Sequence, residues 1–188
     1  KAGVPALAGV DTRAITRKLR EYGTMRGIIT CDPNAAALEK ARTYSIQNPV
    51  GAVTCKAPYR IGGEGRRLVA VLDMGIKHGV FHSLTRRGCD LIVYPSHTEA
   101  DEILSKDPDG IFLSNGPGDP ADNTGIIGEL GKLCGSGTPI FGICLGHQLL
   151  ALSQGARTAK LKYGHRGANQ PVKDLASGRV YITSQNHG

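Results

Sequence analysis

The chain has 188 residues, of which 40% are hydrophobic and 21% charged, which is ordinary for a soluble globular protein of one full domain and part of another. The net charge of +7 could favour nucleic acid, but Lys and Arg are scattered and aromatic residues make up only 5%, so we expect no nucleic-acid partner. No apolar run approaches the roughly 20 residues that span a bilayer, so we expect no membrane segment.

The five cysteines are odd in number, irregularly spaced and free of any CxxC pair: Cys31, Cys55, Cys89, Cys134 and Cys144. This pattern argues against a disulfide framework and against a zinc site. We therefore expect reduced thiols, a cytoplasmic location and no bound metal.

Residues 1–45 are predicted to be part of a small α/β domain. Asp11 or Thr12 can cap a helix through RAITRKLREY, which Gly23 can end. The segment MRGIIT is typical of a short strand, and AAALEKARTY is rich in good helix formers. Residues 46–67 contain Pro and Gly without a clear period, which predicts a linker.

From residue 68 to 188 apolar strands alternate with helical segments. LVAVLDM, DLIVYP, GIFLSN and TPIFGI are the predicted strands, and KHGVFHSLTRRG, ADEILSKD, TGIIGELGKLC and LGHQLLALSQG are the predicted helices. Two further segments that favour strands, ARTAKLKYG and GRVYITSQN, close the chain. The alternation predicts an α/β domain with a mostly parallel, twisted sheet flanked by helices.

The segment PIFGICLGHQLLAL places Cys144 between Gly142 and Gly146 at a strand-to-helix junction. A nucleophile elbow has this pattern, because a sharp turn strains the nucleophile and leaves no room for neighbouring side chains. The helix N-terminus favours the reactive thiolate, and the amide of Leu145 would point at a developing oxyanion. A buried structural thiol is the alternative, which the flanking glycines disfavour.

The loop LSNGPGDP follows the predicted strand GIFL and should lie at the carboxyl edge of the sheet, where open α/β folds bind ligands. Gly116 and Gly118 allow close approach of the backbone to a ligand, and the amide of Gly118 could be the second oxyanion donor. The same residues would also suit a plain turn.

These motifs carry a resemblance to a known family. GICLGHQ, LSNGPGDP and the terminal SQNHG resemble the class I, triad-type glutamine amidotransferases, which have a flavodoxin-like fold. LKYGHRGANQPVKD and GVDTRAITRKLREYG narrow the resemblance to the small, glutamine-hydrolysing subunits of carbamoyl phosphate synthetases. It covers essentially the whole chain.

The resemblance implies that Cys144 attacks the side-chain amide of L-glutamine, forms a thioester and releases ammonia and then glutamate. It implies that glutamine is bound by Gly116, Gly118, Leu145, Gln148, Asn186 and Gly188. It also implies a large partner subunit that uses the ammonia, ATP, magnesium and bicarbonate to make carbamoyl phosphate for arginine and pyrimidine biosynthesis. No cofactor is expected in this chain.

The family's catalytic histidine and glutamate lie in a His-x-Glu segment beyond SQNHG. Since the chain begins with Lys1 rather than Met and stops at Gly188, we expect a fragment truncated before that segment, with little glutaminase activity of its own. His97 and Glu99 have the same spacing, but they precede the cysteine in the chain and are not predicted to replace the pair.

Three alternatives remain open. The chain could be the glutaminase of another amidotransferase, such as a GMP or anthranilate synthase, which the N-terminal residues disfavour. It could be a cysteine hydrolase related to γ-glutamyl hydrolases that acts without a partner. It could also be, in truncated form, a catalytically inactive interaction module.

Overall fold

The computed structural model describes residues 3–188. The chain divides into two compact units, one formed by Lys1–Ser45 with Ala159–Gly188 and the other by Ile46–Thr158.

The Ile46–Thr158 unit is built on a five-stranded sheet in the order β1-β3-β2-β4-β5. Its strands are β1 (Tyr59–Ile61), β2 (Arg67–Asp73), β3 (Cys89–Pro95), β4 (Gly110–Leu113) and β5 (Ile140–Gly142). Only β1 runs antiparallel to its neighbour, and the other three pairs are parallel. The predicted mostly parallel α/β sheet is therefore confirmed.

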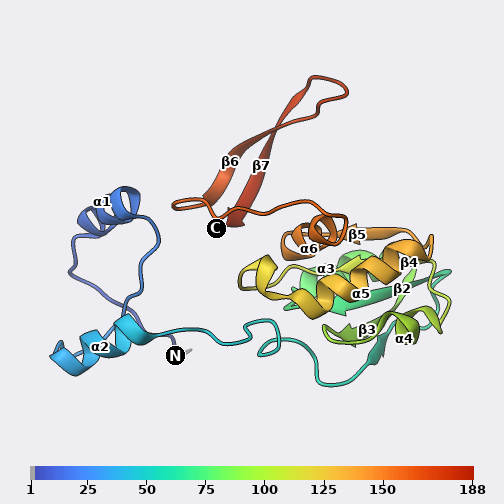
Figure 1. Ribbon diagram of the computed structural model, residues 1–188, viewed down its shortest axis with the longest axis horizontal. Helices are drawn as coiled ribbons and strands as arrows, with labels where there is room; N and C mark the ends of the chain where they lie inside the picture. Colours follow the sequence, from blue (N-terminus) through green and yellow to red (C-terminus); the bar gives the residue numbers. More distant parts are fainter. Residues whose placement is uncertain (1–2) are drawn as a thin grey trace. The chain divides into compact units, whose positions relative to one another are not determined.

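Helices cover both faces of this sheet (Figure 1). They are α3 (His78–Thr85), α4 (Ala100–Leu104), α5 (Thr124–Gly135) and α6 (Leu145–Ser153), with a short 3-10 helix η1 (Pro120–Asp122). Because successive strand residues point to opposite faces, Leu72 packs in a core with α4, α5 and α6, while its neighbour Val71 packs with Phe81 of α3. All four predicted helices of this region are present.

Residues 46–67 are more ordered than the predicted linker. Tyr59–Ile61 forms β1 and pairs with Leu91–Val93 of β3, and Val50 is fully buried in the larger core. The prediction of a linker was wrong here. A strand of three residues gives no recognisable sequence pattern, and its partner strand lies some thirty positions further along the chain.

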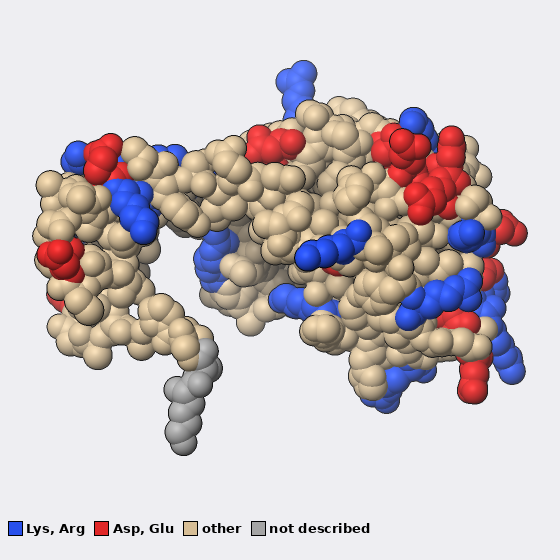
Figure 2. All heavy atoms as spheres, turned by 90° about the horizontal axis from the view of Figure 1, so that it is seen from below, with Lys and Arg blue, Asp and Glu red and all other residues tan. Residues whose placement is uncertain are grey.

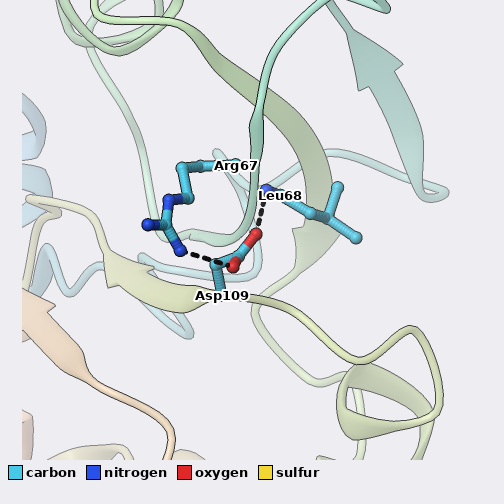
Figure 3. A network of polar contacts seen from close by, with 3 residues as sticks. All are labelled: Arg67, Leu68 and Asp109. Atoms are coloured by element: carbon cyan, nitrogen blue, oxygen red, sulfur yellow. Dashed lines mark hydrogen bonds and ion pairs between the residues drawn. The ribbon is translucent and has the colours of Figure 1, made fainter.

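Asp109 fixes the entrance of β4 beside that of β2 (Figure 3). Its carboxylate accepts a hydrogen bond from the Leu68 amide at 2.7 Å and pairs with the Arg67 guanidinium at 3.1 Å. The Asp109 amide in turn donates to the Leu68 carbonyl at 2.8 Å. The hydrogen bond from the Leu68 amide, aided by Arg67, lowers the pKa of this carboxyl.

The second unit contains α1 (Thr12–Tyr22), α2 (Ala35–Thr43) and an antiparallel hairpin of β6 (His165–Lys173) and β7 (Val180–His187). Asp11 caps α1 by accepting a hydrogen bond from the Ala14 amide, and Gly23 ends it with φ of 87°. The Thr24 amide then donates to the Lys162 carbonyl at 3.2 Å. The two predicted helices are confirmed.

Two predicted strands of this unit are absent. Within residues 3–45 the structure has no strand, so MRGIIT is irregular. The segment ARTAKLKYG is also irregular, and the next strand, β6, begins at His165. Ile28 and Ile29 remain exposed, because no neighbouring strand supplies hydrogen bonds or an apolar face. Among the helices that the structure describes, none combines the length and apolar character that a membrane span requires.

Candidate active site

Cys144 lies between the end of β5 and the first turn of α6, where it is the N-cap residue. Its backbone has φ of 54° and ψ of −111°, a conformation that a residue with a side chain adopts only under strain. The side chain is exposed. The predicted sharp strand-to-helix turn is present, and it presents the thiol to solvent at a helix N-terminus.

The two flanking glycines are required by close backbone packing. A Cβ atom on Gly142 would lie 2.6 Å from the Gly146 carbonyl carbon and from the His147 nitrogen. A Cβ atom on Gly146 would lie 2.4 Å from the Leu113 carbonyl oxygen of β4. Any larger residue at either position would push the elbow away from the sheet.

Leu145 and Gln148 follow the thiol in α6. The Leu145 side chain is buried in the larger core, which anchors the first turn of the helix. Its amide belongs to that first turn, whose N–H groups have no partner within the helix and can meet a substrate oxyanion. The Gln148 amide donates to the Cys144 carbonyl at 3.0 Å, so Gln148 lies one turn after the thiol and is partly buried.

The glycine-proline loop that follows β4 lies against this elbow. A Cβ atom on Gly116 would lie 2.7 Å from Cδ2 of Leu145 and 2.3 Å from the Met74 carbonyl oxygen. Gly118 has φ of 90°, and a Cβ atom there would meet Pro49 at 2.5 Å. The structure thus brings Gly116 beside the residue that follows Cys144, with Gly118 two positions further along the same loop.

Asn186 and Gly188 belong to the other unit. Asn186 lies in β7 opposite Arg166 of β6, and Gly188 directly follows the strand. Their contact with a ligand at Cys144 stays a prediction.

The Cys144 thiol has no hydrogen-bond partner within residues 3–188.

His97 and Glu99, the pair with the spacing of His-x-Glu, line a cavity of about 400 Å³ together with Asn123 and Thr124, at the start of α5. The described residues contain no cluster of three or more His, Cys, Asp or Glu side chains that could hold a metal ion.

Cys144 differs from the other thiols of the Ile46–Thr158 unit. Cys55, Cys89 and Cys134 are partly buried, whereas Cys144 is exposed. Burial raises the pKa of the Cys55 thiol, and the nearby Asp73 carboxylate raises it further. Such a thiol is less reactive, so Cys144 has the best setting for a nucleophile in this unit.

Three residues that no sequence motif assigned a role support the site: Asp73 at the end of β2, and Ser114 and Asn115 at the start of the loop. The Asp73 carboxylate accepts hydrogen bonds from three backbone amides although its residue is only 6% exposed. A carboxylate at the very end of an apolar strand is the sequence signal that could have identified Asp73, because ligand sites form at the carboxyl edge of a parallel sheet.

A family model described as glutamine amidotransferase class-I matches residues 70–188. The carbamoyl phosphate synthase small chain of Symbiobacterium thermophilum is 53% identical, over 99% of this chain and 54% of its own length. The corresponding proteins of Bacillus cereus and Clostridium perfringens are 52% and 49% identical, each over 98% of this chain and 51% and 53% of their own lengths.

The chain therefore spans about half the length of the curated relatives that it matches. Among solved structures, a crystal structure from Thermoplasma acidophilum that is named for one of the subunits of GMP synthase is 31% identical, with a TM-score of 0.48 over 54% of this chain and 51% of that one.

Proposed function

The chain belongs to the class-I glutamine amidotransferases, and from this membership we propose that in the whole protein Cys144 is the nucleophile that hydrolyses the side-chain amide of L-glutamine. The observation that carries the proposal is the exposed thiol in a strained conformation at the N-terminus of α6, beside a loop of glycines. A thiol held only for packing would need neither the strain nor the exposure.

The proposed reaction has two steps. The Cys144 thiolate attacks the carboxamide carbon of glutamine, and the amides of Leu145 and Gly118 stabilise the negative oxygen that forms. The carbon–nitrogen bond then breaks as the nitrogen takes up the proton that the thiol lost on ionising, and ammonia leaves a thioester on Cys144. Water attacks this thioester and releases glutamate with the free thiol. Glutamine and water are consumed, and glutamate and ammonia are formed.

The remaining contacts to glutamine are proposed from the matching motif positions. Gly116 and Gln148 lie on the loop and on the first turns of α6, so both can border a ligand bound at Cys144. Asn186 and Gly188 are proposed to bind the amino-acid end of glutamine through a side-chain amide and a backbone group.

For the whole protein we propose the role of an ammonia-supplying small subunit of a carbamoyl phosphate synthetase. The relatives named as small chains support this role, because their similarity covers nearly the whole chain. The partner would be a large subunit that binds ATP, magnesium and bicarbonate, and this chain would carry no cofactor. The product would feed arginine and pyrimidine biosynthesis in the cytoplasm.

The charge distribution gives no separate reason to propose a nucleic-acid partner. On the face shown in Figure 2, Lys and Arg side chains are interspersed with Asp and Glu. The net charge of +7 is thus not gathered into one basic surface on that face.

Labelling with a glutamine analogue tests the proposed chemistry. The chain is treated with diazo-oxo-norleucine, and the adduct is located by mass spectrometry. We expect modification of Cys144, protection by glutamine but not by asparagine, and no modification in Cys144→Ser. Cys31→Ser is the matched control, because Cys31 is also exposed but has no elbow around it. Modification of Cys31 instead of Cys144, or none while iodoacetamide still reacts with Cys144, would contradict the proposal.

A further inference from the structure

The turn that follows β2 is held by one buried carboxylate. Oδ1 of Asp73 accepts hydrogen bonds from the Gly75 and Ile76 amides at 2.9 and 3.0 Å, and Oδ2 accepts one from the Cys55 amide at 2.9 Å. The residue is 6% exposed, so these bonds replace most of its water. Asp73 therefore fixes the path of residues 73–76 at the carboxyl edge of the sheet.

The glycine-proline loop after β4 rests on this turn. The side-chain amide of Asn115 donates to the Gly75 carbonyl at 2.9 Å, and the Met74 amide donates to the Ser114 hydroxyl at 2.8 Å. A Cβ atom on Gly75 would lie 3.5 Å from Cδ of Pro117, so the turn also packs against the stiff part of the loop. The position of the loop thus depends on the turn beneath it.

The same loop is bonded to the nucleophile elbow. The Gly146 amide donates to the Ser114 carbonyl at 3.1 Å, and the Ile143 amide donates to the Leu113 carbonyl at 3.0 Å. Residues on both sides of Cys144 are therefore tied to the start of the loop. From Gly116 onward the loop makes no hydrogen bond to the elbow. Gly116 packs against Leu145 and Gly118 against Pro49, and the Asn115 side chain bonds the loop to the turn.

We propose that Asp73 and Asn115 are positioning residues, which set the distance between the Gly116–Gly118 part of the loop and the Cys144 thiol. This inference rests on the proposed function, in which a loop amide stabilises the oxyanion. Neither side chain touches the thiol, and both act through the backbone of residues 74–76. Because oxyanion donors must meet the oxygen at hydrogen-bond distance, a small shift of the loop lowers the rate of attack.

The predicted signature separates positioning from folding. Asn115→Asp keeps the size of the side chain but replaces the donor to the Gly75 carbonyl with an acceptor. We expect the maximal rate of Cys144 labelling by diazo-oxo-norleucine to fall roughly 10- to 100-fold. The concentration that gives half this rate should change less than about twofold, because the amino-acid end of the analogue is bound elsewhere. Alkylation by iodoacetamide needs the thiolate but no oxyanion donor, so its rate should stay near that of the unaltered chain.

The matched control is Asn34→Asp. The Asn34 side-chain amide also donates a hydrogen bond, to the Asp32 carboxylate at 2.7 Å, but it makes no bond to the turn, the loop or the elbow. Its labelling rate should remain unchanged. Asp73→Asn is the second test and should slow labelling in the same way. If it fails to fold, Asn115→Asp still decides the matter.

Each outcome has one meaning. An unaltered chain that alkylates with iodoacetamide but is not labelled by the analogue overturns the proposed function, and the positioning role with it. Labelling of Asn115→Asp at the rate of the unaltered chain overturns the positioning role alone. An equal loss of both reactions also overturns it, because the elbow itself would then have been disturbed.

Discussion

The strained backbone of Cys144 persists because its neighbours leave the chain no other path. Gly146 packs so closely on β4 that an added Cβ atom would lie 2.4 Å from the Leu113 carbonyl oxygen, a backbone atom that cannot move aside cheaply. We expect Gly146→Ala to lower the free energy of unfolding by about 1–3 kcal/mol. Analogue labelling of Cys144 should fall by at least about tenfold, as the elbow is displaced. Denaturant titration and mass spectrometry measure the two effects.

Gly131→Ala provides the matched control. Gly131 lies inside α5, and an added Cβ atom would meet nothing within 4 Å. The same substitution should therefore stabilise the chain by about 0.5–1 kcal/mol and leave labelling unchanged. Similar losses from both variants would show that packing at Gly146 is not the cause.

Tyr94 carries a buried hydroxyl without a partner. Within residues 3–188 it is the one buried side-chain nitrogen or oxygen that has no hydrogen bond, and the residue is 2% exposed. Tyr94→Phe should raise the free energy of unfolding by about 1 kcal/mol, since the desolvation cost of the hydroxyl disappears.

Burial also raises the pKa of Tyr94, and the Glu102 carboxylate raises it further. The unfolded phenol ionises near its ordinary pKa of about 10, while the folded one resists ionisation. Stability therefore falls as the pH rises above about 10 in the unaltered chain, and this part of the fall is missing in Tyr94→Phe. Urea titrations at pH 8 and above pH 10 test this. A gap between the two chains that narrows at high pH would contradict it.

At the scale of elements, Asp109 joins the starts of β2 and β4 through the contacts in Figure 3. Because its pKa is lowered in the folded chain, the carboxylate contributes stability above its unfolded pKa of about 4 and loses it as the pH falls through the folded value. Asp109→Asn should thus lower the midpoint of thermal unfolding slightly at pH 7. The two chains should converge as the pH falls below the folded pKa of Asp109. Added salt should weaken the contribution of the Arg67–Asp109 ion pair to stability, because both side chains are exposed. A difference in unfolding midpoint that stays constant with pH would show that the Asp109 charge is not its cause.

Two of the strands that sequence patterns predicted correctly, β2 and β3, bury both faces, whereas the predicted segment GRVYITSQN forms the largely exposed β7. β2 and β3 form long apolar runs, and no choice of partner is needed to recognise them. β1 and the irregular segment MRGIIT show the opposite case, because a short strand exists only where another strand accepts its hydrogen bonds. MRGIIT has the residues of a strand without such a partner, and Tyr59–Ile61 has a partner without a recognisable pattern.

The candidate site shows the same division. The Cys144 elbow can be recognised in the sequence because its defining residues are five consecutive positions, from Gly142 to Gly146. The network of Asp73 and Asn115 joins residues about 40 positions apart, so no local spacing predicts it. Long-range backbone contacts of this kind become visible only in the folded chain.

At the scale of the whole molecule, the two units differ in how much apolar surface they bury. The Ile46–Thr158 unit contains both hydrophobic cores. Among the described residues of the other unit, Ala41 is the one buried hydrophobic side chain, while Ile15, Leu19 and Tyr22 along α1 are exposed. Since apolar burial is the main source of stability, the second unit should open at a lower free energy.

Limited proteolysis of the chain under native conditions tests this difference together with the site. We expect cleavage within residues 3–45 and 159–188 first, and a resistant product near residues 46–158. This product keeps the Cys144 elbow and should still react with iodoacetamide. It loses Asn186 and Gly188, so glutamine should no longer protect the thiol from diazo-oxo-norleucine. The chain in urea, cut throughout, is the control. Early cuts inside β2 or β4 would contradict the stability difference, and full protection by glutamine after removal of 159–188 would exclude those two residues from binding.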